Sequence, residues 1–223
     1  MTQDIINSQV QLYRQQFLEH GDSPDGTFNQ SESIQRLRFS QLLQPLQLEN
    51  ATLHDVGCGI CDLYHFVSGR YDSLTYSGTE IVPEMVALAR SKYPKLDILQ
   101  RDILNDFVPD RYDYVVESGV FNLPGNQDVS SWRRFTRSLI SQMFQMSTKA
   151  ISFNFLNAQV AQYHHPDMYY ELPSEILEYC TSHLSRFCFI NQSYPLYEFT
   201  VTVFKDDHAQ SLFPDVTFSR FFG

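Results

Sequence analysis

The sequence predicts an α/β fold with a doubly wound, seven-stranded, mostly parallel sheet, an N-terminal helical cap and an antiparallel C-terminal hairpin. Three observations predict it. Short apolar runs alternate with stretches of helical spacing after about residue 50, as in strand–helix–strand units. The last two apolar runs follow each other without an intervening helix, which favours an antiparallel pair. The residues before the first run have helical spacing, so they lie outside the repeating units.

Residues 1–48 are expected to form the cap. Apolar residues recur at loose helical spacing over 1–20, and the glycines and proline of 20–26 end that helix. A second helix is expected from Ser31, which caps its N-terminus, to about Gln44, just before a proline.

Residues 49–205 are expected to form the α/β core, beginning with a strand that ends near Asp55. The later strands are expected at 73–80, 96–102, 112–119, 150–156, 186–194 and 198–205. Helices are expected at 83–93, at 130–147 and after Pro173. A chain of 223 residues then forms one domain over 1–205, followed by a loosely packed tail over 206–223. The tail carries phenylalanines that could dock on the domain, at 213, 218, 221 and 222.

Composition and charge limit the possible functions. The hydrophobic fraction of 43% and charged fraction of 19% are typical of a globular protein. No apolar run approaches the ~20 residues of a membrane span, and the N-terminus lacks a signal sequence. We therefore expect a cytoplasmic monomer or homodimer that does not bind membranes. A net charge of −10 argues against a nucleic-acid partner, and Arg133, Arg134 and Arg137 are interpreted as a solvated helix face.

A glycine turn follows the first strand. Asp55, Gly57 and Gly59 precede a helix-like segment, so backbone N–H groups there can approach a ligand closely. The dinucleotide fingerprint would need its third glycine at Asp62, which disfavours an NAD-binding oxidoreductase. The Cys-x-x-Cys formed by Cys58 and Cys61 could indicate redox or metal chemistry. We interpret both as small buried thiols and expect no metal site.

The turn resembles motif I of the class I S-adenosylmethionine (SAM)-dependent methyltransferases, acid-x-Gly-x-Gly-x-Gly, except that Cys61 occupies the third glycine position. Residues 76–85 and 113–122 resemble the next motifs of small members that act on small molecules. Residues 20–24 and 197–200 resemble a bacterial subgroup. The resemblance covers about residues 50–205. It implies a Rossmann-like fold, SAM as the cofactor, and S-adenosylhomocysteine (SAH) as its product.

Three successive strands end in acids, Asp55, Glu80 and Asp102, which should line one crevice at the carboxyl ends of the parallel strands. The resemblance implies that Glu80 accepts hydrogen bonds from both ribose hydroxyls and Asp102 from the adenine amine. Asp55 and the glycine turn, including Cys58, would hold the methionine part of SAM. Ile81 and Ile103 would sandwich the adenine, and Glu117 and Ser118 would complete the site. Alternatively, acids at strand ends cap the following helices.

Arg38 is expected in the same site. Its helix has an apolar face marked by Ile34, Leu37 and Leu42, and Arg38 falls on or beside that face. A buried arginine needs an anion, and the carboxylate of SAM suits its two-pronged guanidinium. The alternatives are an internal salt bridge to Asp55 or Glu117, or a side chain that reaches water.

The methyl-acceptor site has weaker signals. Residues 157–172 are rich in rings and could close over an apolar substrate or pack onto the sheet. Candidate catalytic residues are His164 or His165 as a base, and Glu117 and Asn122 near the transferring methyl group. For the histidines the alternative is a surface or structural role, and for Glu117 and Asn122 it is a cap or a loop hydrogen bond.

These observations predict a SAM-dependent methyltransferase acting on N or O of a small, hydrophobic or aromatic molecule. A role in secondary metabolism rests on analogy. The alternative is a non-catalytic SAM-binding partner or sensor with the same fold, whose acceptor pocket is filled.

Overall fold

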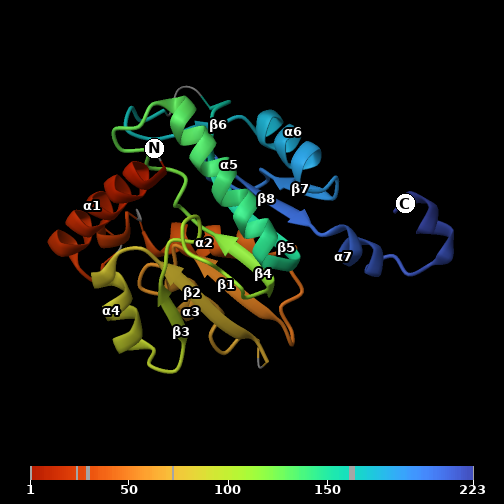
Figure 1. Cartoon of the computed structure of the whole chain (residues 1–223), viewed down its shortest axis with the longest axis horizontal. Coiled ribbons are helices and arrows are strands. Elements are labelled where there is room, and N and C mark those ends of the chain that lie inside the picture. The colour runs from red at the N-terminus through yellow and green to blue at the C-terminus, as the bar shows by residue number, and fades with distance from the viewer. Residues whose placement is uncertain (1, 24, 29–30, 72, 161–163, 223) are drawn as a thin grey trace.

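The protein, described here from a computed structural model, contains one eight-stranded sheet (Figure 1). The structure describes residues 2–23, 25–28, 31–71, 73–160 and 164–222. The strands are β1 Thr52–Val56, β2 Thr75–Glu80, β3 Asp97–Gln100, β4 Tyr112–Glu117, β5 Ser147–Asn157, β6 Tyr170–Glu171, β7 Cys188–Asn191 and β8 Glu198–Phe204. Their order is β3-β2-β1-β4-β5-β8-β7, and the short β6 pairs with β5 off this path. The neighbours along β3 to β5 are parallel, whereas β8 runs antiparallel to both β5 and β7. The predicted fold class is confirmed, with β6 as an additional strand.

Helices cover both faces of the sheet (Figure 1). The helices are α1 Thr2–His20, α2 Glu32–Leu43, α3 Asp62–Val67, α4 Pro83–Lys92, α5 Val129–Met146, α6 Pro173–His183 and α7 Asp206–Ser211, with short 3-10 helices η1 Asp25–Thr27 and η3 Val216–Phe221. One core packs Trp132 of α5 and Ile176 of α6 against the sheet. The opposite core packs Leu42 of α2, Phe66 of α3 and Val86 of α4. The central strands are buried on both sides and therefore consist largely of apolar residues.

The cap brings α1 over the carboxyl ends of β1 and β2. Phe17 of α1 packs with Ile60, Val82 and Met85, which follow those two strands. The N-terminal core residue Ile5 also joins the α5 side of the sheet. In α2, the Ser31 hydroxyl accepts a hydrogen bond from the backbone N–H of residue 34 (3.3 Å), as expected of a cap. The cap therefore roofs the edge of the sheet at which the predicted acids lie.

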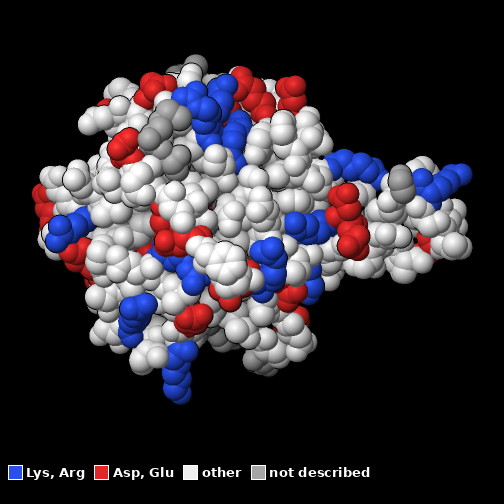
Figure 2. All heavy atoms as spheres, viewed as in Figure 1, with Lys and Arg blue, Asp and Glu red and all other residues white. Residues whose placement is uncertain are grey.

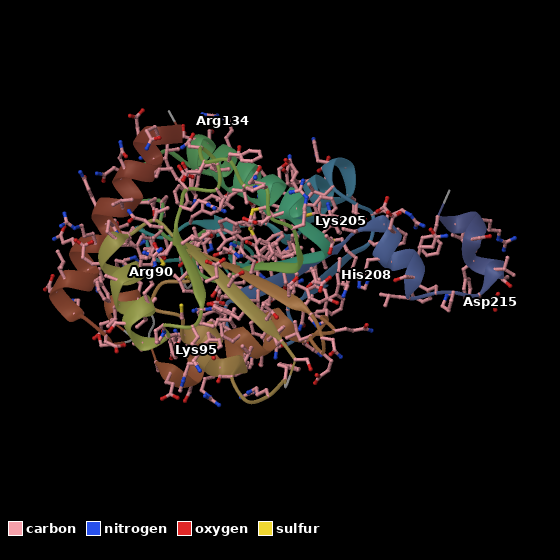
Figure 3. All side chains as sticks on the ribbon, turned by 60° about the horizontal axis from the view of Figure 1, so that its bottom comes forward. Arg90, Lys95, Arg134, Lys205, His208 and Asp215 are labelled. Carbon is pink, nitrogen blue, oxygen red and sulfur yellow. The ribbon has the colours of Figure 1, made fainter. Side chains whose placement is uncertain are left out.

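Two segments, one within the core and one after it, do not form strand–helix units. The connection from β3 to β4, residues 101–111, consists of turns without a helix. The segment after β8 forms α7 and η3 and projects from the body (Figure 1). Lys205 and His208 lie where it leaves the body, and Asp215 lies farther out (Figure 3). Residues 213, 218 and 221 of this segment are exposed phenylalanines, whereas Phe222 stacks on Phe187 with ring centroids 5.2 Å apart.

The arginines of α5 do not form the fully solvated helix face that we expected, because two of them make ion pairs. Arg137 donates to Glu171 (2.7 Å), whose carboxylate is fully buried, and Arg133 pairs with Glu175 (2.8 Å). Only 14% of the Arg137 side chain is exposed, because Glu171 of β6 carries a charge into the core and needs a partner. Figure 2 shows basic and acidic side chains interspersed on this face of the molecule. Among the described residues no helix is long and apolar enough to cross a membrane.

Candidate active site

One cavity lies among α1, α2, α5 and the carboxyl ends of the central strands. Every predicted cofactor residue except Glu117 lines it. These residues are Arg38, Asp55, Gly57, Cys58, Gly59, Glu80, Ile81, Asp102, Ile103 and Ser118. The structure thus brings together residues that are up to 80 positions apart in the sequence, as the carboxyl-end rule predicts. Their individual contacts decide what the cavity can hold.

The glycine turn has left-handed backbone at three alternate positions, Gly57, Gly59 and Cys61, and the reason differs at each. Gly59 (φ +53) faces open space, since a Cβ there would meet nothing within 4 Å, so a ligand can reach its backbone. Gly57 (φ +71) has no such space, because its Cβ would lie 2.4 Å from the Val120 side chain. We expected both glycines to serve ligand approach, but the conformation and the packing of the loop after β4 already require Gly57. Cys61 is also left-handed (φ +69), which explains the usual glycine there better than helix packing does.

Glu80 links the end of β2 to this turn. One carboxylate oxygen accepts from the Gly59 N–H (2.9 Å), and the other accepts from the N–H groups of Ile81 (2.7 Å) and Val82 (2.9 Å). Burial raises the pKa of Glu80, and these three hydrogen bonds oppose that shift. A carboxylate has about four lone-pair positions, so about one is left for a ligand hydroxyl. Accepting from both ribose hydroxyls, as predicted, would require one of the backbone bonds to open.

Asp55 is buried beneath the turn and bonded to a tyrosine. Its carboxylate accepts from the Tyr76 hydroxyl at 2.6 Å, and only 4% of the residue is exposed. Burial raises the pKa of Asp55 to about 7, against the opposing effect of that hydrogen bond, and repulsion from Glu80 adds to the shift. The side chain is therefore a carboxyl group that takes up a proton near neutral pH.

Gly78 of β2 is a structural residue of the site that the sequence interpretation missed. A Cβ there would lie 2.7 Å from the Cys58 sulfur and 2.8 Å from its Cβ. Gly78 therefore makes room for the glycine turn on the neighbouring strand. Its signal in the sequence was a glycine inside a predicted strand, which often marks close approach of another backbone. Cys58 and Cys61 are both buried thiols, as interpreted.

Asp102 organises the turn that follows β3. Its carboxylate accepts from the Leu104 N–H (3.0 Å) and from the Asn105 side-chain amide (2.5 Å). Both oxygens are therefore engaged within a local turn and not at a helix cap, although the residue lines the cavity. The neighbouring Ile103 is 4% exposed, and Ile81 is half-buried at the same cavity.

Glu117 lies behind the cavity wall and not on its surface. It is fully buried, and one oxygen accepts from the Val120 N–H, which holds the loop after β4. The other oxygen has no hydrogen-bond partner among the described residues. Burial raises the pKa of Glu117 to about 8, with a further contribution from Asp55. Asn122 and Ser118, in contrast, line the cavity, and the Asn122 Oδ1 and Ser118 Oγ atoms have no partner among the described residues.

Arg38 points inward as predicted, but a residue of this chain holds its guanidinium. It donates to Glu198 at the start of β8 through Nε (2.9 Å) and Nη2 (2.5 Å). The Glu198 carboxylate also accepts from the Asn154 amide (3.1 Å). An internal salt bridge was an open alternative, but with Asp55 or Glu117 as the partner. The prediction that Arg38 is reserved for the SAM carboxylate needs this correction, because the two-pronged pair with Glu198 already uses two of its nitrogens.

The two histidines proposed as bases lie away from the cavity. His164 stacks on Tyr170 with centroids 4.0 Å apart, and His165 lies 3.9 Å from Asp167 with 60% of its side chain exposed. Neither lines the cavity. Both are exposed, so the structure does not bring them to the cavity in which a base was expected. The predicted ring Tyr163 lies outside the described residues.

The remaining rings of the 157–172 loop do not fill the cavity. Tyr169 is buried against the core and donates to Glu171 (2.8 Å). Met168 is the one described residue of this loop that lines the cavity. The described part of the loop therefore packs mainly onto the sheet, which was the alternative left open.

Helix α1 contributes cavity residues that the sequence interpretation did not identify. Ile6, Gln9 and Tyr13 all line the cavity. The Tyr13 hydroxyl lies 3.5 Å from the Gly119 carbonyl oxygen, and its ring meets Phe28 edge-on at 5.2 Å. Their spacing of three and four residues places them on one helix face, a signal that was present in the sequence.

The sequence of the chain is similar to those of two proteins named as putative methyltransferases. No protein-family model matches the chain. It is 28% identical to Putative methyltransferase Rv1506c of Mycobacterium tuberculosis over 156 residues, which cover 69% of this chain and 93% of that protein. It is also 28% identical to Putative methyltransferase 235L of Invertebrate iridescent virus 6 over 91 residues, covering 40% of this chain but only 34% of the viral protein.

Solved structures share the fold over most of the chain. Magnesium protoporphyrin IX methyltransferase from Synechocystis PCC 6803 with bound SAH has a TM-score of 0.60 at 13% identity, covering 88% of this chain and 99% of its own. The N-methyltransferase NodS from Bradyrhizobium japonicum WM9 with SAH has a TM-score of 0.57 at 14% identity, covering 89% and 98%. The chain has the class I methyltransferase fold. The predicted resemblance is thereby confirmed at the level of the fold.

The lining of the cavity indicates what kind of ligand it could hold. The open face of Gly59 leaves room for a ligand against the backbone, and buried carboxyls surround it. Buried carboxyls with raised pKa values suit a ligand that carries positive charge, because the charge stabilises their ionised forms. Among the described residues no group of three or more His, Cys, Asp or Glu side chains could hold a metal ion.

Proposed function

We propose that this protein transfers a methyl group from SAM to nitrogen or oxygen of a small, apolar or aromatic molecule. The observation that carries the proposal is the cavity itself. It joins the glycine turn and its acids to an apolar chamber beyond them. The two relatives named as methyltransferases and the shared fold support the same class of reaction.

Residues of the β1 and β2 ends would hold the cofactor. Gly59 offers its open backbone, Glu80 keeps the turn in place, and Ile81 with Ile103 gives apolar walls for a flat ring. SAM supplies an activated methyl group on a sulfonium, so the protein chiefly has to align the acceptor with it. Alignment of this kind contributes on the order of 7–11 kcal/mol at its upper end. With SAM bound, the acceptor atom would take the methyl group, the sulfur would become the neutral thioether of SAH, and any proton on the attacking atom would pass to water.

Glu117 holds the loop after β4, part of which lines the cavity. It accepts from the Val120 N–H and has one oxygen without a described partner. A positive charge in the cavity would favour its ionised form, which would then stabilise that charge in return. We therefore assign Glu117 an electrostatic and positioning role, and we assign Asn122 to contact with the acceptor.

The alternative of a non-catalytic SAM sensor predicts a filled acceptor pocket. The described residues of the 157–172 loop instead leave the chamber open, with only Met168 at its wall. This observation favours an enzyme.

Calorimetric titration with SAM, SAH and NAD tests the cofactor. We expect SAM and SAH to bind and NAD not to bind. Gly59→Ala should weaken SAM at least tenfold, because its methyl group would stand where the ligand approaches. Gly69→Ala is the matched control, since Gly69 is also left-handed (φ +76) with open space around its Cβ position but lies outside the cavity. Equal effects of the two substitutions, or preferred binding of NAD, would contradict the proposal.

Transfer of label from methyl-tritiated SAM to a panel of small phenols, amines and N–H heterocycles tests the reaction. We expect at least one acceptor to become labelled by wild-type protein and not by Gly59→Ala. Tight SAM binding without transfer to any member of a broad panel would favour the sensor.

A further inference from the structure

Helix α1 places an unpaired amide in the wall of the cavity. Only 3% of Gln9 is exposed, and both its Nε2 and its Oε1 have no hydrogen-bond partner among the described residues. A buried amide without hydrogen-bond partners destabilises the fold, so such groups usually serve a ligand or bind water. Gln9 lines the cavity, where a ligand could satisfy both atoms.

A second buried amide lies on the loop opposite α1. Asn122 is 9% exposed, lines the cavity, and has an Oδ1 atom without a described partner. The same loop touches Gln9, since a Cβ on Gly125 would lie 3.8 Å from the Gln9 Nε2 atom. Tyr169 fixes the backbone of Asn122 by donating its N–H to the Asn122 carbonyl (2.9 Å). The two amides therefore belong to one end of the cavity, held by α1 and by the loop after β4.

Apolar side chains from five parts of the fold line the same cavity as these amides. The chamber is lined by Ile6, Leu123, Phe135, Leu139, Leu156 and Met168. They come from α1, the loop after β4, α5, the end of β5 and the 157–172 loop. Figure 1 shows the N-terminal end of α1 beside the start of α5, and Ile6 and Phe135 belong to one core. A ligand with an apolar body and a single polar edge matches such a chamber.

The ion pair of Arg38 with Glu198 in the cavity lining favours an uncharged ligand. Arg38 and Glu198 line the cavity, but each neutralises the other through two hydrogen bonds. Bringing an anion or a cation here would leave its charge poorly paired, which is costly in a buried site. The two amides, in contrast, present both donors and acceptors without charge.

We propose that Gln9 and Asn122 select the methyl acceptor, and that the acceptor is an uncharged molecule whose apolar body carries a polar edge with both a hydrogen-bond donor and an acceptor. Carboxamides, lactams and N–H heterocycles belong to this class. The inference rests on the proposed function, because it assigns the second half of the same cavity. It adds the chemistry that the acceptor must present.

Binding of four one-ring probes to the protein saturated with SAH tests it. The probes are benzamide, benzoate, benzylammonium and toluene, which share a ring and differ in charge and hydrogen bonding. We expect benzamide to bind about tenfold more tightly than toluene and more tightly than either ion. Absence of benzamide binding at millimolar concentrations, or tighter binding of an ion, would overturn the inference.

Gln9→Leu measures how much the Gln9 amide contributes to the choice of ligand. It keeps a similar shape and removes both hydrogen-bonding atoms, so the preference for benzamide over toluene should fall about tenfold while SAH affinity stays unchanged. Gln11→Leu is the matched control, because Gln11 lies on the same helix and is exposed. Asn122→Ala is a second variant that should also reduce the preference. If Gln9→Leu and Asn122→Ala both keep the wild-type preference, the inference is wrong. Absence of SAH binding by wild-type protein would instead contradict the proposed function.

Discussion

The raised pKa values of the cavity carboxyls lead to a prediction about pH. Burial raises the pKa of Asp55 to about 7 and that of Glu117 to about 8. In the ligand-free protein both groups therefore hold protons in mildly acidic solution and lose them in mildly alkaline solution. SAM carries a sulfonium charge, which favours the ionised carboxylates and lowers both pKa values. Binding of SAM should release protons, and its affinity should rise with pH through the range of pH 7 to 8.

The size of the effect follows from Coulomb's law. A sulfonium about 5 Å from a carboxylate, at an effective dielectric constant of about 20, interacts with it by about 3 kcal/mol. That energy corresponds to about two pKa units. SAH has the same amino-acid part but no sulfonium charge, so its binding should respond much less. We expect the ratio of SAM to SAH affinity to increase at least tenfold from about pH 6 to about pH 8.5.

Calorimetry measures both quantities. Titrations of SAM in two buffers with different ionisation enthalpies count the protons released, and titrations across the pH range give the affinities. Glu117→Gln should remove part of the pH dependence, whereas Glu178→Gln, an exposed position outside the cavity, should leave it intact. Identical pH dependence for SAM and SAH would refute the reasoning.

The same groups make the stability of the ligand-free protein depend on pH. A carboxyl whose pKa is raised by folding favours the folded state while it is protonated. That contribution is complete below the ordinary pKa of about 4 and is lost as pH rises through about 7 for Asp55 and about 8 for Glu117. The free energy of unfolding should therefore fall across this window, and Glu117→Gln should reduce the fall.

Three further predictions concern single contacts. Glu80→Ala removes the acceptor of three backbone N–H groups and should weaken SAM binding about ten- to a hundredfold in calorimetry, since hydrogen bonds to charged groups contribute ~1.5–3 kcal/mol; an unchanged dissociation constant would exclude the role. Cys61→Gly should leave SAM affinity and the melting temperature unchanged, because the left-handed backbone at Cys61 suits glycine. Gly57→Val should abolish SAM binding and lower the melting temperature, because its side chain would collide with Val120. Arg38→Ala should cost about 3–5 kcal/mol in urea unfolding by leaving Glu198 unpaired, and it should weaken SAM and methylthioadenosine alike; a selective loss of SAM would restore the carboxylate role.

The sequence predicted the order of the elements because most of them have local causes. Apolar runs of strand length and helical spacing recur along the chain, and Ser31 begins α2 as expected. The strand β6 escaped detection because two residues carry no periodicity. The positions of Asp55, Glu80 and Asp102 at one cavity follow from the parallel sheet alone, which is a rule about topology and not about side chains.

The directions and partners of side chains were much less predictable. Helical spacing correctly placed Arg38 inward, but its partner Glu198 is 160 residues away, and no local rule identifies it. His164 and His165 were selected by residue type, yet the course of the loop turns them outward. Gln9 was overlooked because a glutamine on a helix is usually solvated, although its spacing from Ile6 and Tyr13 placed it on the cavity face.

The charge distribution of the cavity bears on how a product would leave it. Asp55 and Glu80 lie at the glycine turn, whereas Arg38 and Glu198 neutralise each other and Gln9 and Asn122 carry no charge. Under the proposed function, methyl transfer would remove the sulfonium charge from the cavity, and the stabilisation given by the carboxylates would be lost. Their pKa values would return toward the raised values of the ligand-free protein, and Asp55 and Glu117 would take up protons again near neutral pH. The burial that makes these carboxyls costly to ionise would therefore favour SAM over SAH and assist release of the spent cofactor.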